Sequence, residues 1–312
     1  YWDWRYIFYL NVPISIICIF LAWKYIPSEE RKERLKVRFD AVGFVLSGFS
    51  LAGFMYGVEI LSKDGVSYFY SLLIIGFSLL LLWFNVRYSK HISHPLIDYS
   101  VMKINSYKVT ILTGSVSRMI IGVFPYLVPL MFQEGFGLNP FESGLLFLST
   151  MVGNLSMKSL TVWIMHRFRF RTILIVNGCF SALFTFFTAL LMPTTPVYVI
   201  VLVLFTAGLF RSLQFSSLTT LAFTDTPASQ TTAANTLYST IQQMSTGMGI
   251  AMGAVVLRFS NIINHGIAGH YTIPDFRLVF IFVTVLGFVH LYGYTKLSKD
   301  AGSVVMLKKK MF

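Results

Sequence analysis

Charged side chains are scarce in this sequence. Only 12% of its 312 residues are Asp, Glu, Lys or Arg, whereas 55% are hydrophobic and 16% are aromatic. A soluble domain carries about 25% charged residues because its surface must be solvated. The composition therefore indicates a polytopic membrane protein, and it argues against a soluble enzyme, a nucleic-acid-binding domain or a disulfide-stapled secreted domain.

Cysteines and catalytic motifs are also lacking. The two cysteines, Cys18 and Cys179, both lie inside apolar runs, so they suggest no metal site. The sequence contains no H-E-x-x-H, no G-x-S-x-G and no P-loop, and no nucleophile–base pair is discernible. We expect no enzyme activity, no cofactor and no metal ion.

The net charge of +12 comes from short basic clusters between apolar runs, not from one amphipathic face. This distribution is typical of the cytoplasmic loops of a membrane protein. It does not indicate nucleic acid as a partner.

Long apolar runs make up most of the chain. A membrane-spanning helix needs about 20 mostly apolar residues to cross about 30 Å of hydrocarbon, and nine runs meet this requirement. The predicted spans are 6–26, 41–61, 69–88, 109–132, 141–164, 172–192, 197–222, 233–257 and 276–297.

The basic clusters alternate with these spans. If the nine spans alternate in direction, the segments rich in Lys and Arg all fall on one side of the membrane, which the positive-inside rule assigns to the cytoplasm. The C-terminus is then cytoplasmic as well. The rich segments are 27–40, 87–108, 166–171 and 296–312, whereas the other connections contribute only Arg5, Lys63, Arg258 and Arg277.

Three blocks of the sequence resemble a known family. Residues 2–13, WDWRYIFYLNVP, resemble the W-R-W-I-F-x-x-N-x-P signature of the major facilitator superfamily, in particular the fourteen-span drug:proton antiporters of the EmrB/QacA-like group. Residues 40–43, DAVG, resemble the D-x-x-G start of that group's seventh span. Residues 242–253, QQMSTGMGIAMG, resemble its Gln- and Gly-rich thirteenth span. The resemblance covers essentially the whole chain.

The resemblance implies an all-α membrane protein with nine transmembrane helices, spans six to fourteen of a fourteen-span fold, in a fragment that lacks the first five. An odd number of spans, which is rare in a transporter built from repeats, agrees with this prediction. The expected parts are 1–26, the last helix of the N-terminal bundle; 27–40, a cytoplasmic basic loop; 41–88, two extra linker helices; 89–108, a cytoplasmic connection; 109–297, the C-terminal six-helix bundle; and 298–312, a cytoplasmic basic tail.

The gate motif of the family, G-x-x-x-D-R-x-G-R-[KR], is altered here. Residues 165–171 read MHRFRFR, in which Arg167 and Arg171 match the motif and are the gating candidates. His166 replaces the Asp that would hold the arginines in one gate state. A plain cytoplasmic anchor for the helix ends is the alternative.

Two arginines lie deep inside predicted spans, where a charged side chain costs about 2.5–3.5 kcal/mol on insertion scales. At about 1.5 Å per residue, Arg118 is roughly 14 Å and Arg211 about 21 Å from the start of its span. No Asp or Glu lies at matching depth in the six C-terminal spans. Each arginine either binds substrate or locks helix packing through hydrogen bonds.

Further polar residues could line a central cavity with the arginines. Gln214 lies three residues after Arg211 and is expected on the same helix face. Such polar stripes serve interhelical hydrogen bonds equally well. The candidates are Gln214, Asn154, Asn235 and Gln242, and the same stripes also contain Ser156, Lys158 and Gln243.

By resemblance, the complete protein is expected to export small amphipathic compounds or drugs in exchange for protons, in a bacterial inner membrane. Its expected partners are the small-molecule substrate, protons, the lipid bilayer and the missing N-terminal helices. The alternatives are a metabolite exporter or importer of the same fold, since fold does not fix function, or a non-transporting membrane scaffold or sensor. If Arg118 and Arg211 both face the cavity, the substrate carries an acidic or zwitterionic group.

Overall fold

The computed structural model describes residues 5–25, 40–61, 68–92, 95–265 and 270–303. The chain divides into two units, Tyr1–Phe39 and Asp40–Phe312, and each is described by itself. The first contains the helix α1 (Arg5–Tyr25). Trp2 to Trp4 of the N-terminal signature, nearly all of the basic segment 27–40 and most of the tail 298–312 lie outside the described residues.

The second unit is helical. Between its long helices, the described residues include a π-helical turn (Met131–Gly135) after α4 and 3-10 turns at Tyr99–Lys103 and Ala228–Gln230. The helices are α2 (Ala41–Leu61), α3 (Tyr68–Ser89), α4 (Asn105–Leu130), α5 (Pro140–Arg167), α6 (Phe170–Ala189), α7 (Val197–Thr224), α8 (Thr231–His265), α9 (Ile273–Val289) and α10 (Leu291–Tyr294).

The all-α membrane fold expected from the sequence is confirmed. Among the described residues, eight helices are long and apolar enough to cross a membrane, and α1 adds a shorter apolar stretch, Asn11–Tyr25. One predicted bound was inaccurate, since helix α8 continues to His265, beyond the predicted end at 257. The span predicted at 276–297 corresponds to the candidate span Ile273–Tyr294, which comprises α9 and α10.

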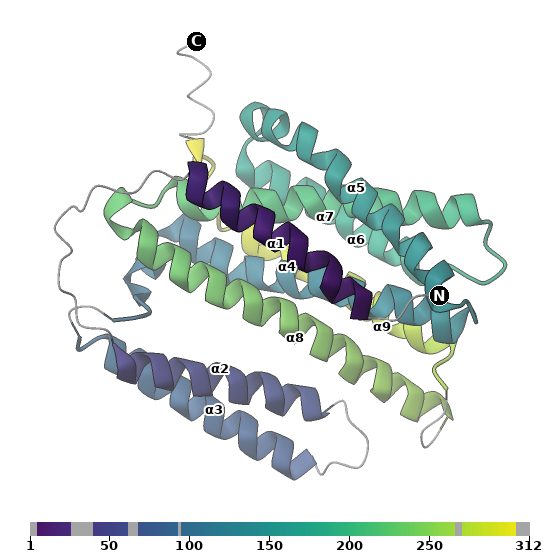
Figure 1. The fold of residues 1–312 in the computed structure, drawn as a ribbon, viewed down its shortest axis with the longest axis horizontal. Helices are drawn as coiled ribbons and strands as arrows, with labels where there is room; N and C mark the ends of the chain where they lie inside the picture. Colours follow the sequence, from purple (N-terminus) through teal and green to yellow (C-terminus); the bar gives the residue numbers. More distant parts are fainter. Residues whose placement is uncertain (1–4, 26–39, 62–67, 93–94, 266–269, 304–312) are drawn as a thin grey trace. The chain divides into compact units, whose positions relative to one another are not determined.

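Helices α2 and α3 bury small or polar side chains and expose large apolar ones, the opposite of a helix pair in a soluble protein. They lie side by side, and α2 also contacts α8 (Figure 1). Their buried positions are mostly small or polar, and include Ser47, Ser50, Ser71 and Ser78. Their exposed positions are large and apolar, and Phe49 is 67% exposed. This is the arrangement that lipid requires, because only small and hydrogen-bonded groups gain by facing another helix there.

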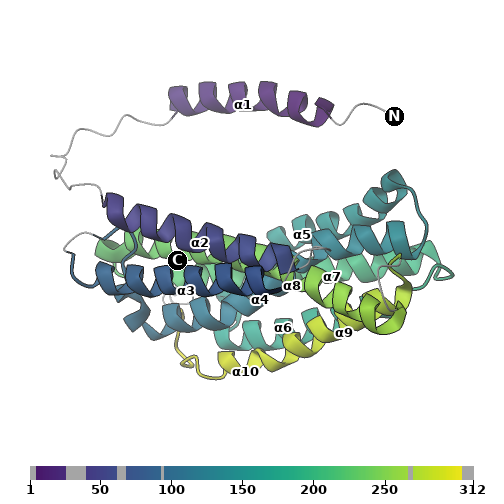
Figure 2. The same ribbon diagram turned by 90° about the horizontal axis from the view of Figure 1, so that it is seen from below.

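The other helices form a bundle in the same unit. Helix α4 packs mainly on α8, and α5 on α7. Helices α9 and α10 run alongside α6 (Figure 2). Aromatic and aliphatic side chains from α4, α7 and α9, such as Phe124, Leu204 and Phe280, form a core in this bundle.

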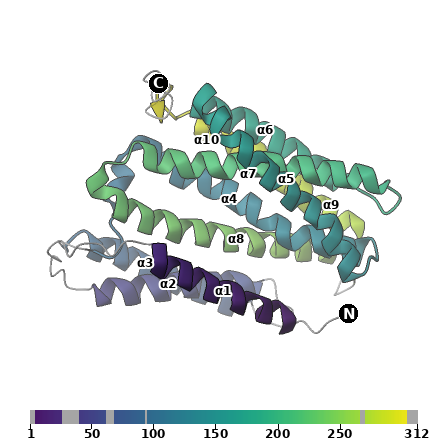
Figure 3. The same cartoon turned by 45° about the horizontal axis from the view of Figure 1, so that its top comes forward.

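Helices α5 and α7 are neighbours along much of their length (Figure 3). Matching residues recur every four positions, so the two helices run in the same direction. The pairs are Thr150 with Gly208, Asn154 with Ser212, and Lys158 with Ser216.

Glycine makes this close approach between α5 and α7 feasible. A Cβ at Gly208 would come within 2.2 Å of the Thr150 carbonyl oxygen, and one at Gly153 within 2.1 Å of the Phe205 carbonyl oxygen. Both obstacles are backbone atoms, which cannot rotate away. A side chain at either position therefore forces the helices apart.

A carboxylate ties together the ends of α2 and α3. Asp40, just before α2, accepts hydrogen bonds from the Gly43 amide (2.8 Å), the Leu96 amide (3.0 Å) and the Tyr88 hydroxyl (3.2 Å). Burial raises the pKa of Asp40, but these three hydrogen bonds outweigh burial and leave the pKa below its ordinary value. The D-x-x-G block recognised in the sequence is thus a helix cap that also holds the segment after α3.

We predict that Gly153→Ala destabilises the protein by about 1–3 kcal/mol, the usual cost of overpacking. Gly144→Ala on the same helix is the matched control, because its Cβ would meet no atom within 4 Å. It should be neutral or slightly stabilising, since Ala is the better helix former. Thermal unfolding of the purified protein in detergent measures both. Equal effects of the two substitutions would contradict the close α5–α7 contact.

Asp40→Ala should cost about 0.5–2 kcal/mol, as the loss of a helix cap does. A lowered folded-state pKa means that the stabilisation is present above the unfolded-state pKa and is lost as pH falls through the folded-state pKa. Asp40→Asn keeps a capping side chain but should remove this part of the acid sensitivity. Unfolding curves of the wild type and both variants between neutral pH and about pH 3 test this; identical pH dependence in all three would refute it.

Candidate functional site

Arg211, the deeper of the two arginines, is buried in α7 without a hydrogen bond. Its side chain is 4% exposed, and none of Nε, Nη1 and Nη2 has a hydrogen-bond partner in the structure. The guanidinium carbon lies 2.9 Å from the centroid of the Phe124 ring on α4. The guanidinium group therefore lies over the face of the Phe124 ring, and its N–H donors are buried without an acceptor.

A pocket of about 230 Å³ opens beside Arg211, between α4, α5 and α7. Its polar lining includes Asn154 and Lys158 from α5, and Ser212 from α7. Phe124, Phe147 and Met151 contribute apolar surface. The structure therefore brings together two of the sequence candidates, Arg211 and Asn154, in one partly apolar pocket.

Lys158, which belongs to the same polar stripe as Asn154, also lines this pocket. It is exposed on α5, and its Nζ donates a hydrogen bond to the Ser216 hydroxyl (3.0 Å). Its spacing of four residues from Asn154 places both on one helix face. The structure therefore places the two ends of this polar stripe in one pocket.

Arg118 lies elsewhere, against α8. It is 1% exposed, its Nη1 donates to the Thr110 carbonyl oxygen (3.3 Å), and its guanidinium carbon is 4.6 Å from the centroid of the Tyr238 ring. It does not line the Arg211 pocket. Its contacts lie within α4 and to α8, and its Nε and Nη2 have no hydrogen-bond partner in the structure.

Gln214 points away from Arg211, although the spacing predicted a shared face. Its amide oxygen accepts a hydrogen bond from Asn177 Nδ2 on α6 (2.8 Å). It lines a separate cavity of about 20 Å³ with Ser117 and His290, which is close to the space that one water molecule needs. Three residues along an α-helix turn the direction of the side chain by about 300°, which is about 60° short of a full turn. This difference is enough to place the two side chains against different helices.

The remaining candidates are dispersed. On α8, Asn235 is exposed and Gln242 is half-buried, and neither lines the Arg211 pocket. Of the gating candidates, Arg167 is exposed at the end of α5, whereas Arg171 donates to the Leu297 carbonyl oxygen (3.4 Å). This bond ties α6 to the segment after α10, as an anchor would.

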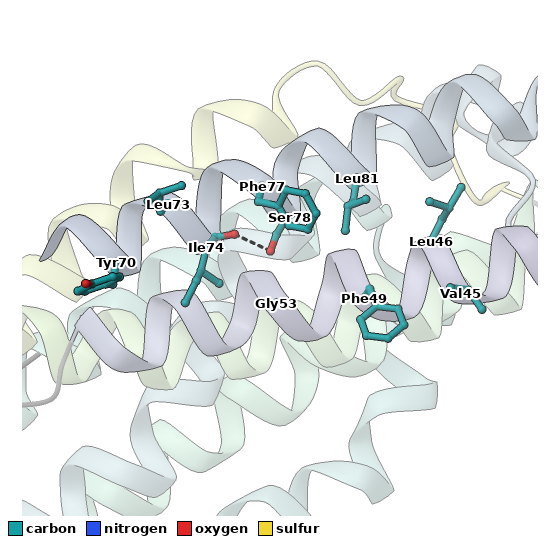
Figure 4. Close-up of a pocket in the computed structure, with 10 residues that line it drawn as sticks. All are labelled: Val45, Leu46, Phe49, Gly53, Tyr70, Leu73, Ile74, Phe77, Ser78 and Leu81. Atoms are coloured by element: carbon teal, nitrogen blue, oxygen red, sulfur yellow. Dashed lines mark hydrogen bonds between the residues drawn. The ribbon is translucent and has the colours of Figure 1, made fainter. Parts of the chain in front are cut away.

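A larger groove of about 640 Å³ runs between α2 and α3. Figure 4 shows its lining, in which the Ser78 hydroxyl is already bonded to the Ile74 carbonyl oxygen. The lining contains no Asp, Glu, Lys, Arg or His. The groove offers an apolar surface but no group that could select a charged substrate, so the smaller Arg211 pocket is the better candidate site.

The comparison with protein families matches residues 1–250 to the Major Facilitator Superfamily. This chain belongs to the Major Facilitator Superfamily. Several relatives of this chain are named multidrug resistance protein MdtD. One from Pectobacterium carotovorum is 28% identical over 260 residues, and one from Escherichia coli O6:H1 is 26% identical over 261 residues. Each alignment covers 82% of this chain and 54% of the relative.

A relative from Serratia proteamaculans, also named MdtD, is 26% identical over 260 residues and is covered to 53%. The chain thus spans about half the length of the relatives it matches. These relatives support the narrower resemblance to drug:proton antiporters, and the eight apolar helices agree with an integral membrane protein of this superfamily.

The two buried arginines should respond differently to the same substitution. Arg118→Gln removes a charged hydrogen bond and a contact with Tyr238, so we expect a loss of about 1.5–3 kcal/mol in stability. Arg211→Gln removes a buried charge that has no hydrogen bond in the protein, so stability should be retained or increased. Thermal unfolding of both variants in the same detergent provides the comparison. A larger loss for Arg211→Gln would assign the packing role to Arg211 instead.

Proposed function

We propose that this chain is the C-terminal part of a secondary transporter that exports small amphipathic compounds in exchange for protons across a bacterial inner membrane. Within it, α2 and α3 are two linker helices between the halves, and α4 to α10 form the C-terminal bundle. The superfamily match and the multidrug-resistance names of the relatives support this assignment. The observation that carries it furthest is the polar pocket beside Arg211.

The depth of that pocket suits transport. Arg211 lies fourteen residues after the start of the 28-residue helix α7, which corresponds to about 21 Å and to the middle of the helix. Transporters of this type bind substrate near the bilayer midplane, between two halves that rock around the site. Since the relatives are about twice as long, we infer that a second half supplies the rest of the site and the proton-coupling groups.

The proposed orientation places the C-terminus in the cytoplasm. A reporter enzyme or fluorescent protein fused after Phe312 should be active only if that end is cytoplasmic. A matched fusion in the connection between α6 and α7, near Pro193, should report the opposite side. Two fusions that report the same side would refute the alternating arrangement of the spans.

Transport is tested with the full-length protein in proteoliposomes. A pH gradient imposed across the proteoliposome membrane should drive uptake of a fluorescent amphipathic compound, and a protonophore should abolish that uptake. Vesicles that hold residues 1–312 alone should show none, because alternating access needs both halves. Flux that is independent of the pH gradient would favour a different coupling, and an absence of flux from the full-length protein would favour the scaffold or sensor alternative.

A further inference from the structure

We propose that the pocket between α4, α5 and α7 is an anion subsite, in which Arg211 and Lys158 bind the acidic group of an amphipathic organic acid. This inference deepens the proposed function, because it takes the pocket as part of the substrate site. It also revises the hypothesis that the sequence alone suggested. The two cations of the site are Arg211 and Lys158, whereas Arg118 faces α8.

Unpartnered polar atoms point to a ligand in this pocket. Three nitrogens of Arg211 and the hydroxyl of Thr150, which also lines the pocket, are buried without a hydrogen-bond partner. In folded proteins about 90% or more of such buried groups are paired. Nε and Nη2 of Arg118 are also unpaired, but Arg118 does not line this pocket; the four unpaired atoms here gather beside a volume that a ligand can fill.

The charge of the lining selects an anion. The pocket contains two basic side chains and no Asp or Glu. A guanidinium group stays protonated under all ordinary conditions and presents parallel N–H donors that match the two oxygens of a carboxylate. Away from bulk water, attraction between opposite charges is several times stronger than in water. A cationic substrate would instead be repelled by both side chains.

The positions of the two cations are fixed by the α5–α7 contact. Ser212, the residue after Arg211, donates from its hydroxyl to the Asn154 carbonyl oxygen (2.8 Å). One turn further along α5, Lys158 is held by Ser216 (3.0 Å). These contacts orient the pocket before a ligand binds, which reduces the entropy that binding must overcome.

The apolar part of the lining indicates what the rest of the ligand is like. Phe124, Phe147 and Phe215 provide aromatic surface, and Met151 provides a flexible apolar side chain that adapts to different shapes. The volume of about 230 Å³ is below the roughly 300–1,000 Å³ of pockets for drug-sized ligands. The pocket therefore suits a small aromatic acid, or the acidic end of a larger one.

The test uses the full-length protein in nanodiscs and three probes of similar shape: 2-naphthoate, the neutral 2-naphthamide and the cationic 2-naphthylmethylammonium. Calorimetric titration measures the affinity for each. We expect the wild type to bind naphthoate at least about tenfold more tightly than the amide, in line with a charge-assisted hydrogen bond, and to bind the cation most weakly.

Arg211→Gln should reduce the affinity for naphthoate about 10–100-fold and leave that for the amide within about threefold. Arg211→Lys should recover part of this loss, because it restores the charge without the planar donor pair. Lys158→Gln should cause a smaller, selective loss. Lys108→Gln, which removes an exposed charge near the start of α4 outside the pocket, is the matched control and should leave all three affinities unchanged.

Two outcomes would overturn the anion subsite: wild-type protein that binds the amide or the cation as tightly as naphthoate, or Arg211→Gln that binds naphthoate normally. Equal loss of naphthoate and amide together with a lower unfolding temperature would also overturn it, in favour of a packing role. Selective binding without flux in proteoliposomes would refute transport but retain the subsite. Flux without any preference for the acid would refute the subsite but retain transport.

Discussion

The structure depends on one constraint: hydrocarbon offers no hydrogen bonds, so every polar group in a membrane span must find its partner inside the protein. In the α2–α3 pair, the buried Ser47, Ser50 and Ser78 follow this rule by donating to carbonyl oxygens of their own helices, and large apolar side chains are exposed. Thr and Ser hydroxyls elsewhere bond to carbonyls one turn earlier, as Thr110 does with Ser106. Against this background, an unpartnered buried guanidinium is a departure that requires an explanation.

Because α5 packs closely on α7, the structure holds together without hydrogen bonds from the Arg211 guanidinium group. Gly153 and Gly208 let the two backbones touch, so the interface is held by helix contact rather than by the side chain of Arg211. Arg118 has different neighbours: its Nη1 donates to the Thr110 carbonyl oxygen and its guanidinium group lies over the Tyr238 ring, while Nε and Nη2 are unpaired. The two arginines thus differ both in depth and in the groups that surround them.

The sequence predicted the span positions well, because apolar length and basic loops report directly on a bilayer. It identified the Asp40–Gly43 block as a family feature, and the structure supplies its reason as a cap. The arrangement of the site was harder to predict. Whether Gln214 joins Arg211 depends on a rotation of about 60° relative to α6, which one-dimensional spacing cannot fix. The polar stripe of Asn154 and Lys158 needs no such rotation, because residues four apart lie on one helix face.

The location of the pocket connects these points to transport. Helices α4, α5 and α7 come from separate parts of the chain, yet each contributes a distinct element: an aromatic face from Phe124, a flexible cation from Lys158 and a planar cation from Arg211. A site shared among several helices changes when those helices tilt relative to one another. A ligand that bridges Arg211 and Lys158 therefore binds one tilt of α5 on α7 better than another. Since a ligand shifts a conformational equilibrium only by its difference in affinity for the two states, occupancy of this pocket is coupled to helix movement by the same contacts that hold the anion.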